Sequence, residues 1–276
     1  MAGNQPIEVS GRSVGGIETC IDVPELKLCF DIGRCPQWAV SRGRVLFTHP
    51  HMDHLGGVAY HAATRALTGQ APPTYVVAPE VQPDLERLLD TWRALDHSEL
   101  PCQVVSAAPG DEVVLDRAWK AAPFRSVHRV ACQGYSLWRR RTSLKPEFVG
   151  LPQSELRRLA SEGVALSGER WTNELAFTGD TRIEVVEQQV DVRTARVLVL
   201  ECTFLDDRVE RARVHQTGHT HLDEIVERAD LFENERIVLS HFSGRYSADQ
   251  ILRLLDAKCP PSLRERIVPL LHDRPG

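Results

Sequence analysis

The chain has 276 residues, of which 42% are hydrophobic and 26% charged, and its formal net charge is −5. This composition excludes a disordered or collagen-like chain, and the absence of a run of ~20 mostly apolar residues excludes a membrane-spanning helix. The acidic balance disfavours a protein coated in basic surface for nucleic acid, although it leaves room for a local basic patch.

Short apolar runs alternate with helical patterns, which is typical of a layered α/β (α+β) domain, here taken to span residues 1–276. Strands are expected at 45–47, 175–177, 197–200 and 237–239. Each of these strands runs into a side chain that can bind metal or protons. In chain order, these side chains are His49, Asp180, Glu201 and His241. Ligands in α/β sheets usually lie at strand ends, so these four endings predict a functional site.

Four helices are expected around these strands. One follows Pro83, where apolar residues recur with a 3.6-residue period between charges. The second starts near Ser154 and stops before Gly163. The third starts near Leu222, and the fourth follows Ser247, which is a good N-cap residue.

Seven cysteines are scattered along the chain. Their number is odd and no two are spaced as C-x-x-C, so neither a disulfide framework nor a zinc ribbon is indicated. The N-terminal residues carry neither the basic segment nor the apolar stretch of a secretory signal. We therefore expect reduced thiols and a cytoplasmic location.

The strongest chemical signal is the H-x-H-x-D-H motif. It consists of His49, His51, Asp53 and His54. Neutral imidazoles and a carboxylate suit a borderline divalent ion such as zinc, and their spacing lets them face two ions. A solvated histidine-rich loop is the alternative. An apolar strand before the motif and the Gly56-Gly57 pair after it favour a built metal site instead.

A site with two ions needs more ligands than this motif supplies. His128, Asp180 and His241 are the candidates, because each follows an apolar run. Alone, each is an ordinary surface or turn residue. Together with the motif, they supply two sets of ligands around the carboxylate of Asp180.

These residues resemble the metallo-β-lactamase superfamily and, more narrowly, ribonuclease Z, the tRNA 3′-processing endonuclease, in its short plant-type form. The narrower resemblance is carried by Glu201-Cys202-Thr203-Phe204, Gly218-His219, the segment from His241 to Tyr246, and the opening from Gly15 to Pro36. It runs along nearly the whole chain. It implies an αββα sandwich with the site at one edge, where the loops of the two sheets meet.

The resemblance also implies two divalent metal ions, zinc or else manganese or iron. The implied ligands are His49, His51 and His128 for one ion, Asp53, His54 and His241 for the other, and Asp180 as the bridge. A hydroxide between the ions would attack the scissile phosphate, and Asp53 would accept a proton from the water. His219 and Glu201 resemble the pair that donates a proton to the departing ribose oxygen.

Other histidines compete for a role or have none. His221 lies two residues past His219 and is an alternative proton donor. His61 and His215 have no partner motif and are expected on the surface.

Substrate contacts are expected from two groups of residues. Ser243 and Arg245 follow His241 closely, and an arginine fork matches phosphate geometry, although a surface ion pair is the alternative for Arg245. From Arg117 to Lys145 there are eight Lys or Arg and no Asp or Glu. Within this stretch we expect Arg139, Arg140 and Arg141 to contact RNA at the mouth of the site, the alternative being a solvated charged hairpin.

The family's tRNA-gripping arm is expected to be reduced. Many bacterial members carry a long arm with a Gly-Pro-rich tip, inserted near Tyr135 to Pro152. Here the stretch is short, and Leu151 to Gly163 resembles the segment that comes after the arm in the family. The plant-type members also have a reduced arm.

Three functions are compatible with these observations. An endoribonuclease that removes 3′ trailers from precursor tRNA, as a homodimer without membrane contact, predicts that the basic stretch faces the site. A small-molecule hydrolase acting on a phosphodiester, lactone or thioester predicts a closed, narrow pocket. A binding protein with a degenerate site is disfavoured, because all seven metal ligands are present.

Overall fold

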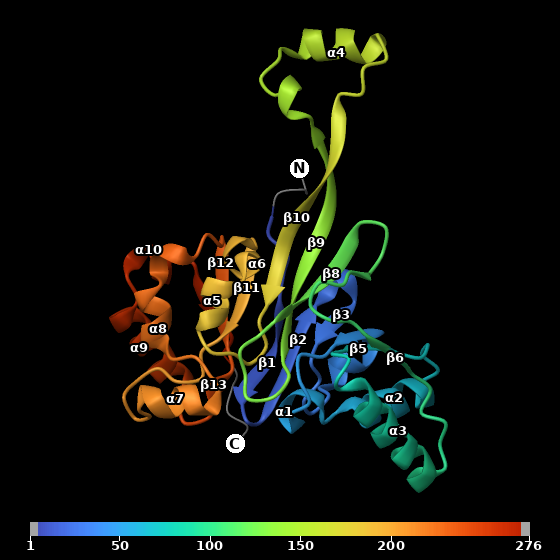
Figure 1. The fold of residues 1–276 in the computed structure, drawn as a ribbon, viewed down its shortest axis with the longest axis vertical. Coiled ribbons are helices and arrows are strands. Elements are labelled where there is room, and N and C mark those ends of the chain that lie inside the picture. The colour runs from blue at the N-terminus through green and yellow to red at the C-terminus, as the bar shows by residue number, and fades with distance from the viewer. Residues whose placement is uncertain (1–4, 272–276) are drawn as a thin grey trace.

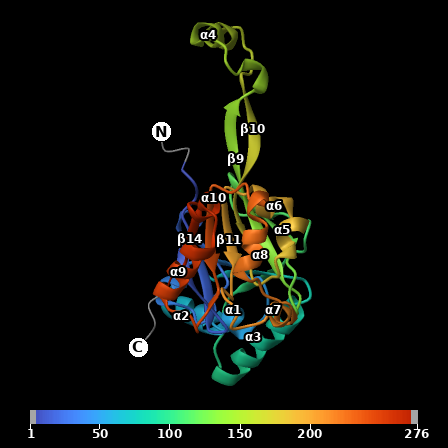
Figure 2. The same ribbon diagram turned by 90° about the vertical axis from the view of Figure 1, so that its left-hand side faces the viewer.

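The computed structural model describes residues 5–271 and contains two seven-stranded sheets. The sheets face each other, with helices on both outer sides, so the αββα sandwich is confirmed (Figures 1 and 2). The first sheet contains, in spatial order, β13 (Phe242–Ser243), β1 (Ser10–Gly15), β2 (Glu18–Val23), β3 (Leu28–Phe30), β4 (Arg44–Leu46), β5 (Thr74–Val77) and β6 (Gln103–Ser106). The second contains β14 (Ile267–Pro269), β12 (Arg236–Ser240), β11 (Val197–Glu201), β10 (Ser167–Phe177), β9 (Gln133–Leu144), β8 (Trp119–Arg125) and β7 (Val113–Val114).

Most of the helices contain only about one to three turns. The α-helices are α1 (Met52–Leu55), α2 (Val58–Leu67), α3 (Gln82–Asp96), α4 (Gln153–Ser161), α5 (Glu184–Gln188), α6 (Val190–Thr194), α7 (Arg211–Thr217), α8 (Leu222–Glu227), α9 (Ala248–Lys258) and α10 (Pro261–Arg264). Single 3-10 turns form η1 (Pro24–Leu26), η2 (Gln37–Ser41), η3 (Pro146–Phe148) and η4 (Ala229–Leu231). The four predicted helices are confirmed as α3, α4, α8 and α9. Ser247 caps α9, since its hydroxyl accepts the Gln250 N–H at 3.3 Å. Within residues 5–271, no helix is both long and apolar enough to span a bilayer.

Three apolar clusters hold the layers together. Between the sheets, the rings of Phe30 and Phe177 lie 4.9 Å apart, and both side chains are buried. On the outer side of the first sheet, Leu85 and Leu89 of α3 pack in a second cluster. A third cluster joins the second sheet to α8 and α9. The fold thus buries both faces of each sheet, which fixes the strand ends where the site residues lie.

The four predicted strands are β4, β10, β11 and β12. β10, β11 and β12 are mutually parallel, so their carboxyl ends meet at one edge of the second sheet. β4 runs parallel to its neighbours β3 and β5 in the first sheet. The loops that follow these strands carry the predicted metal ligands.

The interpretation of the arm is wrong in one respect. β9 and β10 pair from Tyr135–Phe177 out to Leu144–Ser167, and they extend as a ribbon well beyond the sandwich (Figures 1 and 2). η3 and α4 lie at the far end of this ribbon. The segment 151–163 is therefore the tip of a protruding arm rather than a segment after it. Because the arm's strands simply prolong two sheet strands, sequence patterns do not mark where the body ends.

One further expectation is corrected. His61 is fully buried in α2, between the Tyr75 hydroxyl at 2.9 Å and the Ala39 carbonyl at 3.2 Å, so it is not a surface residue. On α3, only Leu85 and Leu89 of the apolar stripe are buried, whereas Trp92 and Leu95 remain exposed. The apolar period continues past the part of α3 that contacts the sheet.

Candidate metal centre and active site

The histidine motif forms the turn from β4 into α1. His49 and His54 are buried, and the Nε2 atom of His49 lies 2.9 Å from the Nδ1 atom of His51. The turn packs tightly against the backbone that follows β3. A Cβ atom at Gly57 would lie 2.4 Å from the Ile32 carbonyl oxygen, so only glycine fits there. The glycine pair thus allows close backbone approach, since a Cβ atom at Gly56 would likewise lie 2.5 Å from the Met52 carbonyl oxygen.

Asp180 lies between two groups of side chains. Its Oδ1 atom is 3.3 Å from His54 Nε2 and 3.4 Å from His241 Nε2. Its Oδ2 atom is 3.7 Å from His49 Nε2. The two carboxylate oxygens thus face different imidazoles, which is the arrangement that a bridging carboxylate needs.

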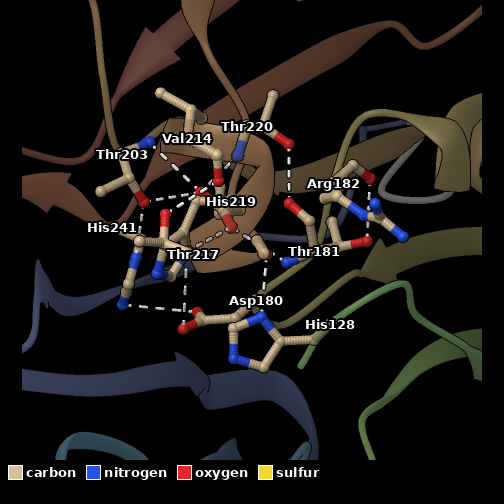
Figure 3. A network of polar contacts seen from close by, with 12 residues as sticks. His128, Asp180, Thr181, Arg182, Thr203, Val214, Thr217, His219, Thr220 and His241 are labelled. Atoms are coloured by element: carbon tan, nitrogen blue, oxygen red, sulfur yellow. Dashed lines mark hydrogen bonds and ion pairs between the residues drawn. The ribbon is translucent and has the colours of Figure 1, made fainter. Parts of the chain in front are cut away.

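The ligand atoms of these residues are close enough to share metal ions. Within residues 5–271, His49, His51, His128 and Asp180 offer atoms within 4.8 Å of one another, and so do Asp53, His54 and His241. Glu201 and His219 form a third such group with Asp180 and His241. The seven predicted ligands therefore come together from separate regions of the chain. Figure 3 shows His128 and His241 beside Asp180.

The chemistry of these donor atoms fits divalent metal ions. The buried Nε2 atoms of His54, His128 and His241 have no hydrogen-bond partner. Burial lowers the pKa values of His49, His51 and His128, which favours the neutral imidazole that binds metal. Burial opposes the charge of Asp180, but His241 and His54 keep its pKa below the ordinary range. The pKa of His54, in contrast, is raised by the carboxylates of Asp180 and Asp31 although burial opposes its charge. A buried carboxylate surrounded by imidazoles whose Nε2 atoms have no hydrogen-bond partner is a cation site.

The imidazoles of the candidate metal ligands are oriented by residues whose roles were not predicted from the sequence. Asp31 accepts a hydrogen bond from His54 Nδ1 at 2.8 Å and from the Thr48 N–H at 2.8 Å. Thr203 Oγ1 lies 2.9 Å from His241 Nδ1, and the Gly218 carbonyl lies 2.8 Å from His128 Nδ1. Such partners fix which ring nitrogen is free for metal. The available signal was that Asp31 directly follows β3.

The backbone of Asp31 is also unusual, because its φ angle is +54°, a conformation that few residues other than glycine adopt. His241 has a φ of +59° at the corresponding point after β12. Strained backbone of this kind is concentrated at functional sites, where the surrounding structure enforces it. Both positions turn a side chain inward at a strand end.

Glu201 and His219 form a hydrogen-bonded pair. His219 Nδ1 lies 2.8 Å from Glu201 Oε1, and the ring keeps 17% of its side-chain surface exposed. Glu201 accepts further hydrogen bonds, from the Thr181 N–H at 2.9 Å and the Thr203 hydroxyl at 2.6 Å. Burial alone would lower the pKa of His219, but the Glu201 carboxylate outweighs it and raises that pKa to about 9. The pair can donate a proton next to the metal ligands.

His221 is a structural residue instead. Its Nδ1 atom accepts the Asp223 N–H at 3.1 Å and caps α8, and its Nε2 atom lies 3.2 Å from the Asp206 carbonyl. His215 is half-exposed on α7, as expected, and is bonded to Glu224. Neither ring belongs to the metal-ligand groups found within residues 5–271.

Ser243 and Arg245 come shortly after the candidate metal ligand His241. The Ser243 N–H donates to the Thr203 carbonyl at 3.0 Å, which ties this segment to the loop of Glu201. Arg245 is exposed and lines a hollow of about 560 Å³ together with Phe204, Arg208 and Arg213. The contact of Ser243 and Arg245 with a phosphate stays a prediction.

The structure does not bring Arg139, Arg140 and Arg141 to the metal site. They lie on β9 at the base of the arm, six to eight residues beyond Gln133 and so roughly 20 Å or more along the strand. Each one faces a carboxylate: Glu25 at 3.5 Å, Glu169 at 3.3 Å and Glu174 at 2.7 Å, respectively. Their contact with RNA stays a prediction, and it would be made through the arm rather than at the mouth.

Comparison with known proteins identifies clear relatives. Residues 41–242 match the model of the Beta-lactamase superfamily domain. The chain is 41% identical to tRNase Z TRZ1 of Arabidopsis thaliana over 267 residues, which cover 96% of this chain and 94% of that protein. It is 34% identical to the chloroplastic tRNase Z TRZ2 of the same plant, covering 95% of this chain and 74% of the other.

Solved structures agree with the fold. The crystal structure of the short form of human tRNase Z superposes with a TM-score of 0.59 at 19% sequence identity. The superposition covers 86% of this chain and 93% of the human one.

Proposed function

The chain belongs to the tRNase Z (ribonuclease Z) family of the beta-lactamase superfamily, and we propose that it acts as a dinuclear-metal endoribonuclease that removes 3′ trailers from precursor tRNA. The observation that carries this proposal is the combination of seven metal-ligand side chains with the Glu201–His219 pair. The 41% identity to a tRNase Z over 96% of the chain supports the same substrate. We take residues 1–276 to act as one metallo-β-lactamase-fold domain.

Two zinc ions are the metals we propose, with manganese or iron as possible replacements. His49, His51 and His128 would hold one ion, Asp53, His54 and His241 the other, and Asp180 would bridge them. When bound, such ions lower the pKa of a water molecule and neutralise the oxygens of a phosphodiester. Different imidazoles face the two carboxylate oxygens of Asp180, which supports two metal ions rather than one.

The chain's own groups would handle the protons. Asp53 Oδ2, held by the Gly16 N–H at 2.9 Å, would accept a proton from the attacking water. His219 would use Nδ1 to bond Glu201 and Nε2 to donate a proton to the departing ribose 3′ oxygen. Ser243 and Arg245 would hold a phosphate beside His241.

A parallel assay tests this proposal. Purified protein loaded with zinc, or separately with manganese, receives a precursor tRNA with a 3′ trailer and, in a second tube, a chromogenic phosphodiester. We expect a single cut in the tRNA, and we expect none with His49→Ala, whose metal content should also fall. Turnover of the small ester with the tRNA left intact would instead support the small-molecule hydrolase.

We also propose a homodimer in the cytoplasm. Large apolar side chains are exposed on α2 and α3: Tyr60, Leu67, Trp92 and Leu95. Burying them against a second copy would remove apolar surface from water. Sedimentation should then give twice the chain mass, whereas Leu95→Glu should favour the monomer. A wild-type protein that is a monomer at all concentrations would refute the dimer.

The proposed cytoplasmic location is supported by the cysteines. All seven are free thiols, which are typical of a reducing compartment.

A further inference from the structure

A basic hollow adjoins the metal-ligand cluster. It has a volume of about 650 Å³ and is lined by the loop from Ser126 to Gln133, by Arg125 and Arg182, and by Glu80 from the loop after β5. This volume is within the range of pockets that hold small ligands. The loop that lines it includes the metal-ligand candidate His128, so the hollow and the reaction site share a residue.

The hollow carries an excess of positive charge. Arg125, Arg129 and Arg182 line it, against the single carboxylate of Glu80. Within residues 5–271, no carboxylate forms an ion pair with Arg125 or Arg129, and the Glu184 carboxylate is 3.9 Å from Arg182. This differs from the arm base, where each of three successive arginines faces its own glutamate. The guanidinium groups of Arg125 and Arg129 are therefore available to an anion, and Arg182 is held only by the long contact with Glu184.

The hollow is rigidly tied to the site. The Arg182 N–H donates to the Val127 carbonyl at 2.8 Å, and the preceding Thr181 N–H donates to Glu201. The backbone of Arg129 packs against Gly218: a Cβ atom on Gly218 would lie 3.1 Å from the backbone nitrogen of Arg129. In Figure 3, Arg182 lies on the far side of Thr181 from His241. An anion in the hollow would therefore be held at a fixed place relative to the reacting phosphate.

The direction of the RNA strand is set by the proton donor. In the proposed reaction His219 protonates the 3′ oxygen of the upstream nucleotide, so that nucleotide lies on the His219 side. The ring of His219 is 6.3 Å from the ring of Phe204, which lines the second hollow with Arg245. The ring of His219 also lies 5.3 Å from the ring of His128, so His219 borders both hollows. Because Arg245 lines the hollow of Phe204, that hollow can take the upstream strand, and the basic hollow at His128 then remains for the downstream strand.

We propose that the hollow of Arg125, Arg129 and Arg182 binds backbone phosphates of the 3′ trailer. This inference rests on the proposed nuclease function and deepens it. Arginine forks bind phosphates irrespective of the base, so the subsite reads the presence of a trailer and not its sequence. It predicts that trailers long enough to reach the arginines bind more tightly than a trailer of one nucleotide.

The test compares two precursor tRNAs that differ only in the trailer, which is a single nucleotide in one and about ten in the other. Arg125→Ala, Arg129→Ala and Arg182→Ala should each raise the KM for the long trailer by about three- to tenfold, and by less for the short one. For the long trailer, log KM should rise with log salt concentration, and the slope of this plot should be smaller by about 0.7 for each phosphate contact that a variant has lost. Arg129→Lys should restore part of the affinity, because it keeps the charge.

Arg253→Ala is the matched control, since Arg253 is an exposed arginine of α9 outside the hollow, and it should leave both KM values unchanged. Equal increases for both trailers, or no increase for either, would overturn the trailer assignment while leaving the nuclease function intact. If the wild-type protein hydrolyses the chromogenic ester but cuts neither precursor, the nuclease function itself fails.

Discussion

The Glu201–His219 pair makes a prediction whose size can be worked out. Glu201→Gln keeps the shape of the side chain but removes the carboxylate that raises the pKa of His219 to about 9. Burial and His54 then lower that pKa while Asp180 still raises it, so it should fall towards the ordinary 6.5. Only the protonated ring can donate, and activity is therefore lost as the pH rises through this pKa.

The loss can be expressed as a fraction of protonated enzyme. With pKa values of about 9 and 6.5, wild type and variant differ about tenfold in protonated His219 at pH 7.5 and about 75-fold at pH 8.5. The assay is single-turnover cleavage of precursor tRNA from pH 6 to 9. We expect the alkaline limb of the variant's profile to move by about two pH units or more towards acid.

Metal content has to be measured in the same samples, because Glu201 is close to Asp180, the proposed bridging ligand. Glu233→Gln is the matched control: it neutralises an exposed glutamate outside the site and should leave the profile unchanged. A Glu201→Gln variant with full metal content and an unshifted alkaline limb would refute the assignment of His219 as the proton donor.

Three further predictions test the surroundings of the site. Asp31→Asn should weaken metal binding about 10- to 100-fold in a chelator competition, because Asp31 orients His54, whereas the exposed Asp230→Asn should not; equal affinity in both would refute this role. Gly218→Ala should lose metal and lower the Tm, since its Cβ would lie 2.7 Å from His128 Nδ1; Gly163→Ala has the same φ of +82° in open space and should retain metal. The pKa of buried His61 is lowered to about 4 by burial and by Arg65, so the unfolded chain binds its proton more readily. Metal-free protein should therefore lose about 3 kcal/mol of stability to this group as the pH falls from 6.5 to 4. Urea unfolding should show a smaller loss in His61→Gln, and the same loss would contradict this.

The strand ends were predictable from sequence because they combine two strong local signals. A buried strand is recognised as an apolar run, and a side chain at its end that can bind metal or protons is conspicuous in an otherwise ordinary turn. His49, Asp180, Glu201 and His241 all follow this rule, and the structure brings them together. The side chains that orient them were not predictable in this way. Asp31 and Thr203 act through hydrogen bonds across the fold, and no spacing along the chain reveals such partners.

The errors concern exposure and position, which depend on tertiary contacts. Nothing local to His61 shows that α2 turns it towards Tyr75 in the core. The charge of Arg139 to Arg141 was read correctly as a basic cluster, but the glutamates that face it come from distant strands and turns. Arg125, Arg129 and Arg182 gained importance only when the fold placed them around one hollow.

The most direct test of the central claim is to map the ends produced when zinc-loaded protein meets a precursor tRNA. Our account predicts one cut, with a 3′ hydroxyl on the nucleotide next to the trailer and a 5′ phosphate on the released trailer. It also predicts that His49→Ala produces neither end. Cuts at scattered positions, or the same ends from His49→Ala, would contradict a metal-dependent tRNA 3′-processing site in this chain.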